Sequence, residues 1–426
     1  MDKVLAVNSG SSSLKFKLFE MPSEAVIASG LIERIAIPGS QTTIKYGNGK
    51  VYKHQGTVKN HGEAVNNLME LLISLGIIEK YSEITGVGHR VVAGGEYFSK
   101  SVVVTDEVIR KIKNITELAP LHNPANLIGI QAFKEMLPDA CSVVVFDTAF
   151  HQTMPEENFL YSVPYEWYEK LGVRRYGAHG TSHRYVAGEA AKLMGRPLKD
   201  LKLVTCHLGA GSSLCAIKNG KSFDTSMGFT PLTGVTMATR SGDVDVSMIA
   251  FVMDKLGINS ISEMIYTLNK ESGLAGISGV SSDMRDILSV SHAKHRARLA
   301  IDIFVKDIVK YIGQYYFEMG GIDGIVFTAG IGENSAVIRK MIMERLSFMN
   351  ITIDNEKNEE QDGATVISGE DSAITMMKIP TNEELMIARD VMELKNKKNK
   401  CQIKRRVVFR QGFLLIQVIA NMAVKR

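Results

Sequence analysis

The sequence predicts an α/β protein built from two related halves, and the first evidence is a pattern that occurs twice. Residues Lys3 to Val7 and Ser13 to Phe19 have the Val-, Leu- and Phe-rich pattern of short strands, and a Gly/Ser loop joins them into an expected antiparallel hairpin. From about residue 150 the pattern restarts, with expected strands at Leu201 to Cys206 and Leu214 to Ile217 around a second glycine-rich loop. Segments with helical periodicity separate these strands.

A shift of 200 residues aligns the two hairpins. The identities after the shift are Val4 with Val204, Ser12 with Ser212, Ser13 with Ser213 and Leu14 with Leu214. Four identities alone are weak evidence, but both segments also have the order strand, small-residue loop, strand. We therefore predict an internal duplication.

The rest of the first half supplies two helices and a buried strand. Apolar residues recur at helical spacing from Val65 to Leu75, and Pro124 is suited to the first turn of a second helix that ends near Met136. The continuous apolar run Ser142 to Phe146 indicates a strand buried on both faces, with Asp147 at its carboxyl end.

In the second half a long helix is expected at Ala297 to Met319, followed by a strand at Ile322 to Thr328 and a loop at Ala329 to Asn334. A last helix is expected to begin at Thr381 with a capping box to Glu384. We expect one domain over residues 1–149 plus about 384–396, a second over 150–383, and an atypical basic tail over 397–426.

Composition excludes several classes of protein. The 426 residues are 45% hydrophobic and 23% charged, which excludes disorder and collagen. The formal charge is +4, yet the last 32 residues hold ten of the 50 Lys and Arg and none of the 46 Asp and Glu, so residues 1–394 carry a net −6. We expect no nucleic-acid or membrane partner. The four Cys have no zinc or disulfide spacing, and with no signal peptide we expect a cytoplasmic protein.

Three small-residue loops each follow an expected strand: Asn8 to Ser12, His207 to Ser213 and Gly330 to Asn334. Backbone N–H groups in such loops can approach phosphate oxygens closely, although a single loop of this kind is more often only a tight turn. Neither a P-loop nor a dinucleotide-binding fingerprint is present.

A transferred phosphoryl group also needs cations and donors. Arg90 and Arg240 have loop-like polar surroundings, where each could instead be a surface arginine or form a structural ion pair. His179, in the segment Gly177 to His183, could equally be a buried, hydrogen-bonded histidine.

Long motifs connect these residues to a known family. N-S-G-S-S-S-L-K at residues 8–15, T-R-S-G-D at 239–243 and P-T-N-E-E-L at 380–385 resemble the acetate and propionate kinase family of the actin, sugar kinase and heat-shock chaperone superfamily. The resemblance covers roughly residues 1–395. It implies two duplicated actin-like (ribonuclease H-like) domains with an interdomain nucleotide cleft. It also implies a homodimer and reversible, Mg²⁺-dependent phosphoryl transfer from ATP to acetate, giving acetyl phosphate and ADP, with Mn²⁺ as a substitute metal.

The resemblance also implies residue roles. Catalytic residues would be Asp147, His179 and Arg240; substrate-binding residues would be Arg90, Val92, Leu121, Ala178 and Pro231; metal ligands would be Asn8 and Glu383. Nucleotide-binding residues would be Lys15, His207, Leu208, Gly209, Ala210, Gly211, Asp283, Met284, Arg285, Gly330, Ile331, Gly332, Glu333 and Asn334.

Two carboxylates need physical comment. The capping box would occupy Glu384 and leave Glu383 for the metal, although Glu383 could instead only favour the helix dipole. Because acetate is already ionised at pH 7, Asp147 has no proton to remove from it. We expect Asp147 to act through the metal's water shell or by orienting Arg or Asn side chains; it could also merely cap a turn.

Three departures from the family pattern bear on specificity and strain. Ala178 stands where the family usually has Phe in the acyl-pocket wall, so a propionate or other short-chain fatty acid kinase is an alternative. Ala238 and Val246 replace the usual Gly and Pro near Arg240, and Ala238 would be strained if its φ were positive. A third hypothesis is a non-catalytic ATP-binding conformational protein, which would not need two arginines for a second substrate.

Overall fold

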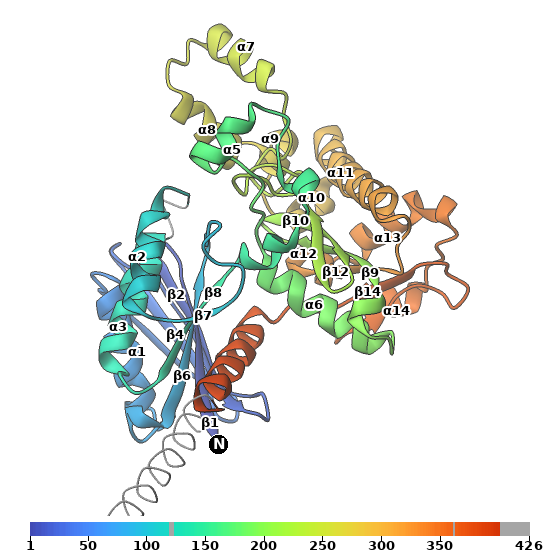
Figure 1. The fold of residues 1–426 in the computed structure, drawn as a ribbon. Coiled ribbons are helices and arrows are strands. Elements are labelled where there is room, and N and C mark those ends of the chain that lie inside the picture. Colours follow the sequence, from blue (N-terminus) through green and yellow to red (C-terminus); the bar gives the residue numbers. More distant parts are fainter. Residues whose placement is uncertain (119–122, 361–362, 401–426) are drawn as a thin grey trace, which may run out of the picture. The chain divides into compact units, whose positions relative to one another are not determined.

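The computed structural model describes residues 1–118, 123–360 and 363–400, and the chain divides into two compact units (Figure 1). The first unit comprises Met1–Val91, Ser101–Val145 and the chain from Glu384 onward, and the second comprises Val92–Lys100 and Phe146–Glu383. Val92–Lys100 belongs to the second unit because the Gly94 N–H donates to Thr148 Oγ1 at 3.1 Å and Phe98 stacks on Phe146.

An eight-stranded sheet forms the first unit. Its strands are β1 (Asp2–Ser9), β2 (Ser13–Met21), β3 (Ala25–Glu33), β4 (Ser40–Tyr46), β5 (Lys50–Gly56), β6 (Ile84–Val91), β7 (Val102–Val103) and β8 (Cys141–Phe146), in the order β5-β4-β3-β2-β1-β6-β8-β7. The antiparallel β1–β2 hairpin and the strand β8 are confirmed. Strands β3 to β7 were not predicted.

Helices lie on both faces of this sheet. They are α1 (His61–Ser74), α2 (Asp106–Asn114), α3 (Asn123–Met136) and the helical residues 383–400, with short 3₁₀ helices η1 (Tyr81–Glu83) and η2 (Thr116–Leu118). Val87 of β6 packs in the core with α1 and α3, which have the predicted bounds to within a few residues. Gly86 and Gly88 face the other way, and a Cβ on Gly88 would overlap Ile387 of the last helix. Close packing of that helix therefore requires glycine at this position.

The second unit repeats the central strand pattern of the first. Its strands are β9 (Lys202–Leu208), β10 (Ser212–Lys218), β11 (Lys221–Thr225), β12 (Gly324–Thr328), β13 (Thr365–Val366) and β14 (Thr375–Lys378), in the order β11-β10-β9-β12-β14-β13. β9 pairs antiparallel with β10 and parallel with β12, as β1 pairs antiparallel with β2 and parallel with β6. The predicted duplication is confirmed.

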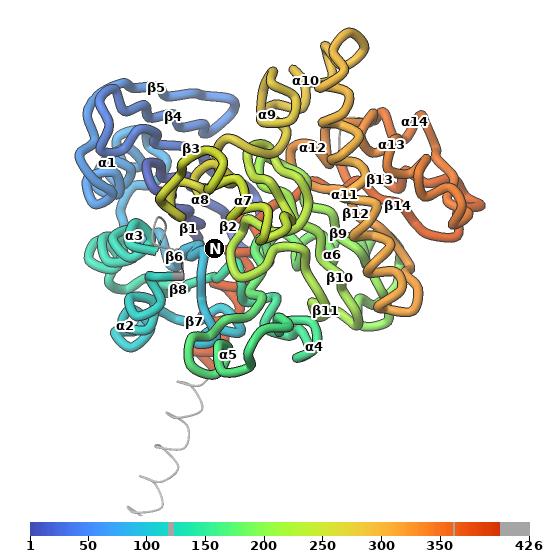
Figure 2. The backbone as a smooth tube through the Cα atoms, turned by 90° about the horizontal axis from the view of Figure 1, so that it is seen from above, coloured from blue at the N-terminus to red at the C-terminus, as the bar shows by residue number. Residues whose placement is uncertain are grey.

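Helices cover both faces of this second sheet (Figures 1 and 2). The helices are α4 (Glu156–Phe159), α5 (Tyr165–Leu171), α6 (Gly180–Leu193), α7 (Val246–Leu256), α8 (Ile261–Lys270), α9 (Gly273–Ser278), α10 (Met284–Val290), α11 (His295–Met319), α12 (Ala329–Asn334), α13 (Ala336–Arg345) and α14 (Asn355–Glu359), with 3₁₀ helices η3 (Ala149–Thr153), η4 (Leu198–Asp200) and η5 (Ser347–Met349). Leu203 of β9 packs with α6, whereas the next residue, Val204, packs with α11. This alternation places the sheet between α6 and α11.

Local predictions at the loops need correction. The expected loops at residues 8–12 and 207–213 are shorter, because Asn8 and Ser9 belong to β1, His207 and Leu208 to β9, and Ser212 and Ser213 to β10. The expected loop over Ala329 to Asn334 is the short helix α12.

The capping box at Thr381 is wrong. The last helix begins at residue 383, the Thr381 hydroxyl is hydrogen-bonded to Ser182, and Glu384 forms ion pairs with Lys15 at 2.5 Å and Lys17 at 3.2 Å. Two lysine ammonium groups stabilise a buried carboxylate more strongly than one backbone N–H does. This difference explains why the Glu384 side chain points towards Lys15 and Lys17 of β2. Because Glu384 forms no cap with Thr381, its side chain gives no reason to prefer Glu383 as a metal ligand.

None of the helices in the described part of the chain is long and apolar enough to cross a membrane. The tail prediction falls mainly on residues 401–426, which lie outside the described residues.

Candidate nucleotide and phosphoryl-transfer site

A cleft of about 690 Å³ lies within the second unit, a volume typical of small-molecule sites. Eight predicted nucleotide-binding residues line it: Gly209, Ala210, Asp283, Met284, Arg285, Gly330, Ile331 and Asn334. They come from the β9–β10 turn, the start of α10 and α12. Sequence reasoning missed five further lining residues, namely Ser282, Leu288, Ser335, Ala336 and Val337. Ser282 precedes Asp283 and Ser335 follows Asn334 in the sequence, so both could have been predicted as neighbours of nucleotide-binding residues.

An ion pair stands at the α10 side of this cleft. Asp283 caps the helix by accepting from the Arg285 N–H at 2.8 Å, and its carboxylate also accepts from Arg285 Nη2 at 2.6 Å. Hydrogen bonds from Arg285 lower the pKa of Asp283 to about 2. Asp283 therefore stays ionised, and it holds the start of α10 and the exposed guanidinium together.

Six predicted nucleotide-binding residues do not line the cleft: Lys15, His207, Leu208, Gly211, Gly332 and Glu333. Lys15 lies in the first unit and pairs with Glu384. Glu333 accepts from the backbone N–H of Ala329 at 2.7 Å and of Thr381 at 2.9 Å, which joins the start of α12 to the segment before the last helix. The Glu333 carboxylate thus accepts hydrogen bonds from two backbone N–H groups of its own unit.

Arg240 and His179 meet beside the β9–β10 turn. A Cβ placed on Gly211 would lie 3.4 Å from Arg240 Nη1, 3.4 Å from His179 Cε1 and 3.5 Å from His179 Nε2. Arg240 Nη1 donates to the Pro231 carbonyl at 3.1 Å. Burial lowers the pKa of Arg240 below the ordinary value of an arginine side chain. A guanidinium and an imidazole therefore converge on the glycine turn whose Gly209 and Ala210 line the cleft.

The backbone of Asp147 contacts the residue that follows His179. The Gly180 N–H donates to the Asp147 carbonyl at 2.9 Å, and His179 precedes α6 with φ of 57°. Asp147 is buried at the carboxyl end of β8, as the strand pattern predicted. The left-handed conformation at His179 turns the chain from the segment after α5 into α6.

Arg90 and Asn8 form a pair in the first unit. They are opposite each other in the parallel β1–β6 register, and Arg90 Nη1 donates to Asn8 Oδ1 at 3.2 Å. Both lie at strand ends, so the loop setting expected for Arg90 is wrong. The carboxyl ends of neighbouring parallel strands meet at one sheet edge, which explains why residues 82 positions apart adjoin.

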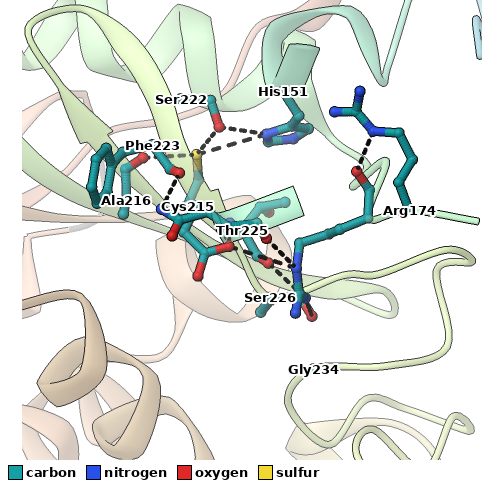
Figure 3. Close-up of polar contacts among 12 residues, drawn as sticks. His151, Arg174, Cys215, Ala216, Ser222, Phe223, Thr225, Ser226 and Gly234 are labelled. Carbon is teal, nitrogen blue, oxygen red and sulfur yellow. Dashed lines mark hydrogen bonds and ion pairs between the residues drawn. The ribbon is translucent and has the colours of Figure 1, made fainter. Parts of the chain in front are cut away.

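Buried histidines surround His179. Its ring stacks on His207 with centroids 4.1 Å apart, and His183 and His151 follow at the inner side. His151 Nε2 donates to the Ala178 carbonyl at 2.9 Å, and its Nδ1 is 2.8 Å from Ser222 Oγ, with Cys215 beside them (Figure 3). Burial lowers the pKa of His151 to about 4 and of His183 well below its usual value, so both rings are neutral at pH 7.

The predicted acyl-pocket residues have mixed placements. Ala178 is buried in a small cluster with Met227 and Met237, both of which are fully buried. Arg240 Nη1 lies 3.7 Å from Met237 Sδ. Val92 is half-buried in the second unit, and Leu121 lies outside the described residues. The space beside Ala178 that the missing phenyl ring would occupy thus adjoins two methionine side chains.

The candidate metal ligands belong to different units. Asn8 belongs to the first unit, and Glu383, half-buried at the start of the last helix, ends the second. Within residues 1–118, 123–360 and 363–400 there is no cluster of three or more His, Cys, Asp or Glu suited to a metal ion.

The remaining departures are locally harmless. Ala238 does not have a positive φ, so the strain considered for Ala in place of Gly does not arise. Val246 occupies the first position of α7, where the Asp245 side chain accepts from the Ser247 N–H at 2.8 Å and caps the helix without proline.

The two α/β units share the order of their central strands, and the second unit holds a nucleotide-sized cleft beside an arginine and a histidine. This combination defines a phosphotransferase of the actin-like fold class. The family model described as the acetokinase family matches residues 3–389, and the chain belongs to this family. It is 59% identical over 397 residues to the acetate kinase of Fructilactobacillus sanfranciscensis, covering 93% of this chain and 100% of that protein.

Solved structures agree. The acetate kinase of Porphyromonas gingivalis superposes with a TM-score of 0.89 at 45% identity, and a propionate kinase from Francisella tularensis with 0.85 at 41%. Each comparison covers 92% of this chain and 100% of the other. The predicted family and fold are therefore confirmed.

Proposed function

We propose that this protein transfers the γ-phosphoryl group of ATP to a carboxylate oxygen of acetate, reversibly, giving acetyl phosphate and ADP. The observation that carries the proposal is the convergence of Arg240 and His179 on Gly211, at the turn that also lines the 690 Å³ cleft. ATP bound in the cleft would direct its phosphates towards this turn, where backbone N–H groups can approach them.

Each charged group then has a separate task. Arg240 would neutralise charge on the equatorial oxygens of the phosphoryl group, and His179 would donate a hydrogen bond to them. Arg90, held by Asn8 in the first unit, would bind the acetate carboxylate. Because acetate needs no deprotonation, we assign Asp147 an orienting role rather than that of a general base.

Asn8 and Glu383 are the proposed ligands of a magnesium ion. Amide and carboxylate oxygens are the ligand types Mg²⁺ prefers, and Asn8 Oδ1 keeps a second lone pair beside its bond to Arg90. Mg²⁺ usually takes one or two protein carboxylates together with substrate phosphates and water. The ion would supply neutralisation of phosphate charge, and Mn²⁺ would substitute for it.

The acceptor is proposed to be acetate rather than a longer acid. Met227 and Met237 pack against Ala178 and compensate for the missing phenyl ring. Propionate is the second candidate, because a propionate kinase is among the similar solved structures and methionine side chains adapt readily.

A homodimer is proposed from the surface of α7 and α8. Large apolar side chains stand exposed along these two helices, at Val246, Phe251, Leu256, Ile261 and Tyr266. An apolar face of this kind is typical of a protein interface. Light scattering at micromolar concentration should give twice the chain mass, and Phe251→Asp should give a monomer; a monomeric wild type would exclude the proposal.

The activity is tested by trapping the product with hydroxylamine in the presence of ATP, Mg²⁺ and acetate. We expect acetyl hydroxamate to form in proportion to ADP and to require all three components. ATP binding without hydroxamate would instead indicate the non-catalytic alternative.

A further inference from the structure

The side of His179 that faces away from the cleft is held by a chain of buried side chains. His179 Nδ1 is 2.8 Å from Ser213 Oγ, and the same hydroxyl is 2.8 Å from His183 Nε2. His183 Nδ1 in turn is 2.7 Å from Thr205 Oγ1. Ser213, His183 and Thr205 are fully buried, and all four residues belong to the second unit.

Two proton arrangements let the fully buried Ser213 hydroxyl donate within this chain. Ser213 and Thr205 each have one hydroxyl hydrogen, and neutral His183 has one ring N–H. If Thr205 donates to His183 Nδ1, then His183 Nε2 donates to Ser213, and Ser213 donates to His179 Nδ1. As long as Ser213 donates within the chain, reversing one link reverses all three, and His179 then carries its proton on Nδ1.

The two arrangements present opposite faces of His179 to the site. In the first, neutral His179 carries its proton on Nε2, the atom beside Gly211 and Arg240. In the second, a neutral ring turns a lone pair in that direction, which would repel an anionic phosphoryl oxygen. Buried His183 is neutral at pH 7, so it supplies one ring N–H to the chain in either case.

We propose that Thr205, His183 and Ser213 are positioning residues that hold His179 in the tautomer with its proton on Nε2, ready to donate to the transferred phosphoryl group. This inference rests on the proposed function, because an anionic phosphoryl group is what requires His179 to carry its proton on Nε2. It assigns a role to His183, which is fully buried.

The first test reads the tautomer directly, without turnover. In enzyme labelled with ¹⁵N-histidine, long-range ¹H–¹⁵N spectra distinguish the two neutral tautomers, and loss of signals in His179→Gln assigns the ring. We expect Nε2 protonation in the wild type and a mixture of tautomers in Ser213→Ala. A wild-type His179 protonated on Nδ1, or an unchanged tautomer in Ser213→Ala, would overturn the proposal.

Kinetics provide the second readout. Ser213→Ala should lower kcat about tenfold or more, as loss of a group that orients a functional histidine does elsewhere, with KM for ATP changed by less than about twofold. Ser222→Ala is the matched control, since it removes an equally buried hydroxyl at 2.8 Å from Nδ1 of His151 and lies off the chain (Figure 3). It should leave kcat and the His179 tautomer unchanged; an equal loss of kcat in this control would overturn the proposal.

Thr205 tests the far end of the chain with a nearly isosteric pair. Thr205→Val removes the hydroxyl and should give the mixed tautomer, whereas Thr205→Ser keeps it and should preserve the wild-type spectrum. Equal spectra for the two variants would contradict the chain. A folded wild type without phosphoryl transfer would refute the proposed function, while the spectra would still decide the hydrogen-bond arrangement.

Discussion

Acyl-chain selectivity should depend on the methionines packed against Ala178, and Met227→Ala tests this. Met227 is fully buried in the cluster with Ala178, whereas Met237 Sδ contacts Arg240 Nη1, so truncating Met227 leaves that contact in place. The substitution removes three side-chain heavy atoms. Each methylene buried in the freed space is worth about 0.8 kcal/mol, or roughly a fourfold change in kcat/KM. We therefore expect the propionate-to-acetate ratio of kcat/KM to rise about fourfold, and the butyrate ratio to rise further.

The assay compares kcat/KM for acetate, propionate and butyrate in the wild type and the variant. Met343→Ala is the matched control, because Met343 is equally buried but belongs to the main core of the second unit. Both substitutions should cost about 2–5 kcal/mol of stability, but only Met227→Ala should change the ratio. A folded Met227→Ala enzyme with wild-type ratios would refute the assignment of Ala178 to the acyl pocket.

Three further predictions concern charge, pH and packing. Arg240→Ala should lower turnover about 10³-fold or more, and Arg240→Lys should recover little, because an ammonium lacks the planar fork; near-native kcat in Arg240→Lys would exclude a guanidinium clamp. Burial lowers the pKa of His151 to about 4, so the ring takes up a proton on unfolding below pH 6.5; between pH 6.5 and 4.5 the wild type should lose roughly 2 kcal/mol of stability that His151→Asn does not lose, and parallel plots of unfolding free energy against pH would contradict this. Gly88→Ala should destabilise by about 1–3 kcal/mol through overlap with Ile387, and Ile387→Ala should remove most of that added cost in a double-mutant cycle; strict additivity would contradict the packing.

The sequence predicted the elements whose pattern matches their burial. Residues Val65 to Leu72 repeat at helical spacing because α1 buries one stripe, and Ser142 to Phe146 is continuously apolar because β8 is covered on both faces. Strand β5 was missed because its residues are mostly exposed and polar, and β4 was missed because two of its buried residues, Ser40 and Thr42, are polar, so apolar alternation is weak in both.

Predictions of side-chain partners were less successful than predictions of elements. Thr381 and Glu384 have capping-box spacing, but the spacing cannot reveal that Lys15 and Lys17, more than 360 positions away, take the carboxylate. Likewise, the motif around His179 identifies a functional histidine, whereas Ser213 reaches His179, and Thr205 reaches His183, only because β9 and β10 pair beside α6. Such contacts depend on tertiary structure, and no local pattern encodes them.

In the proposed reaction, a carboxylate oxygen of acetate attacks the γ-phosphorus of ATP. Incubating the enzyme with ATP, Mg²⁺ and acetate labelled with ¹⁸O in both oxygens tests this most directly, with the product followed by ³¹P NMR. We predict acetyl phosphate whose phosphorus signal shows the isotope shift of one ¹⁸O, together with ADP. Unlabelled phosphorus in the product, or release of AMP and pyrophosphate in place of ADP, would contradict direct transfer.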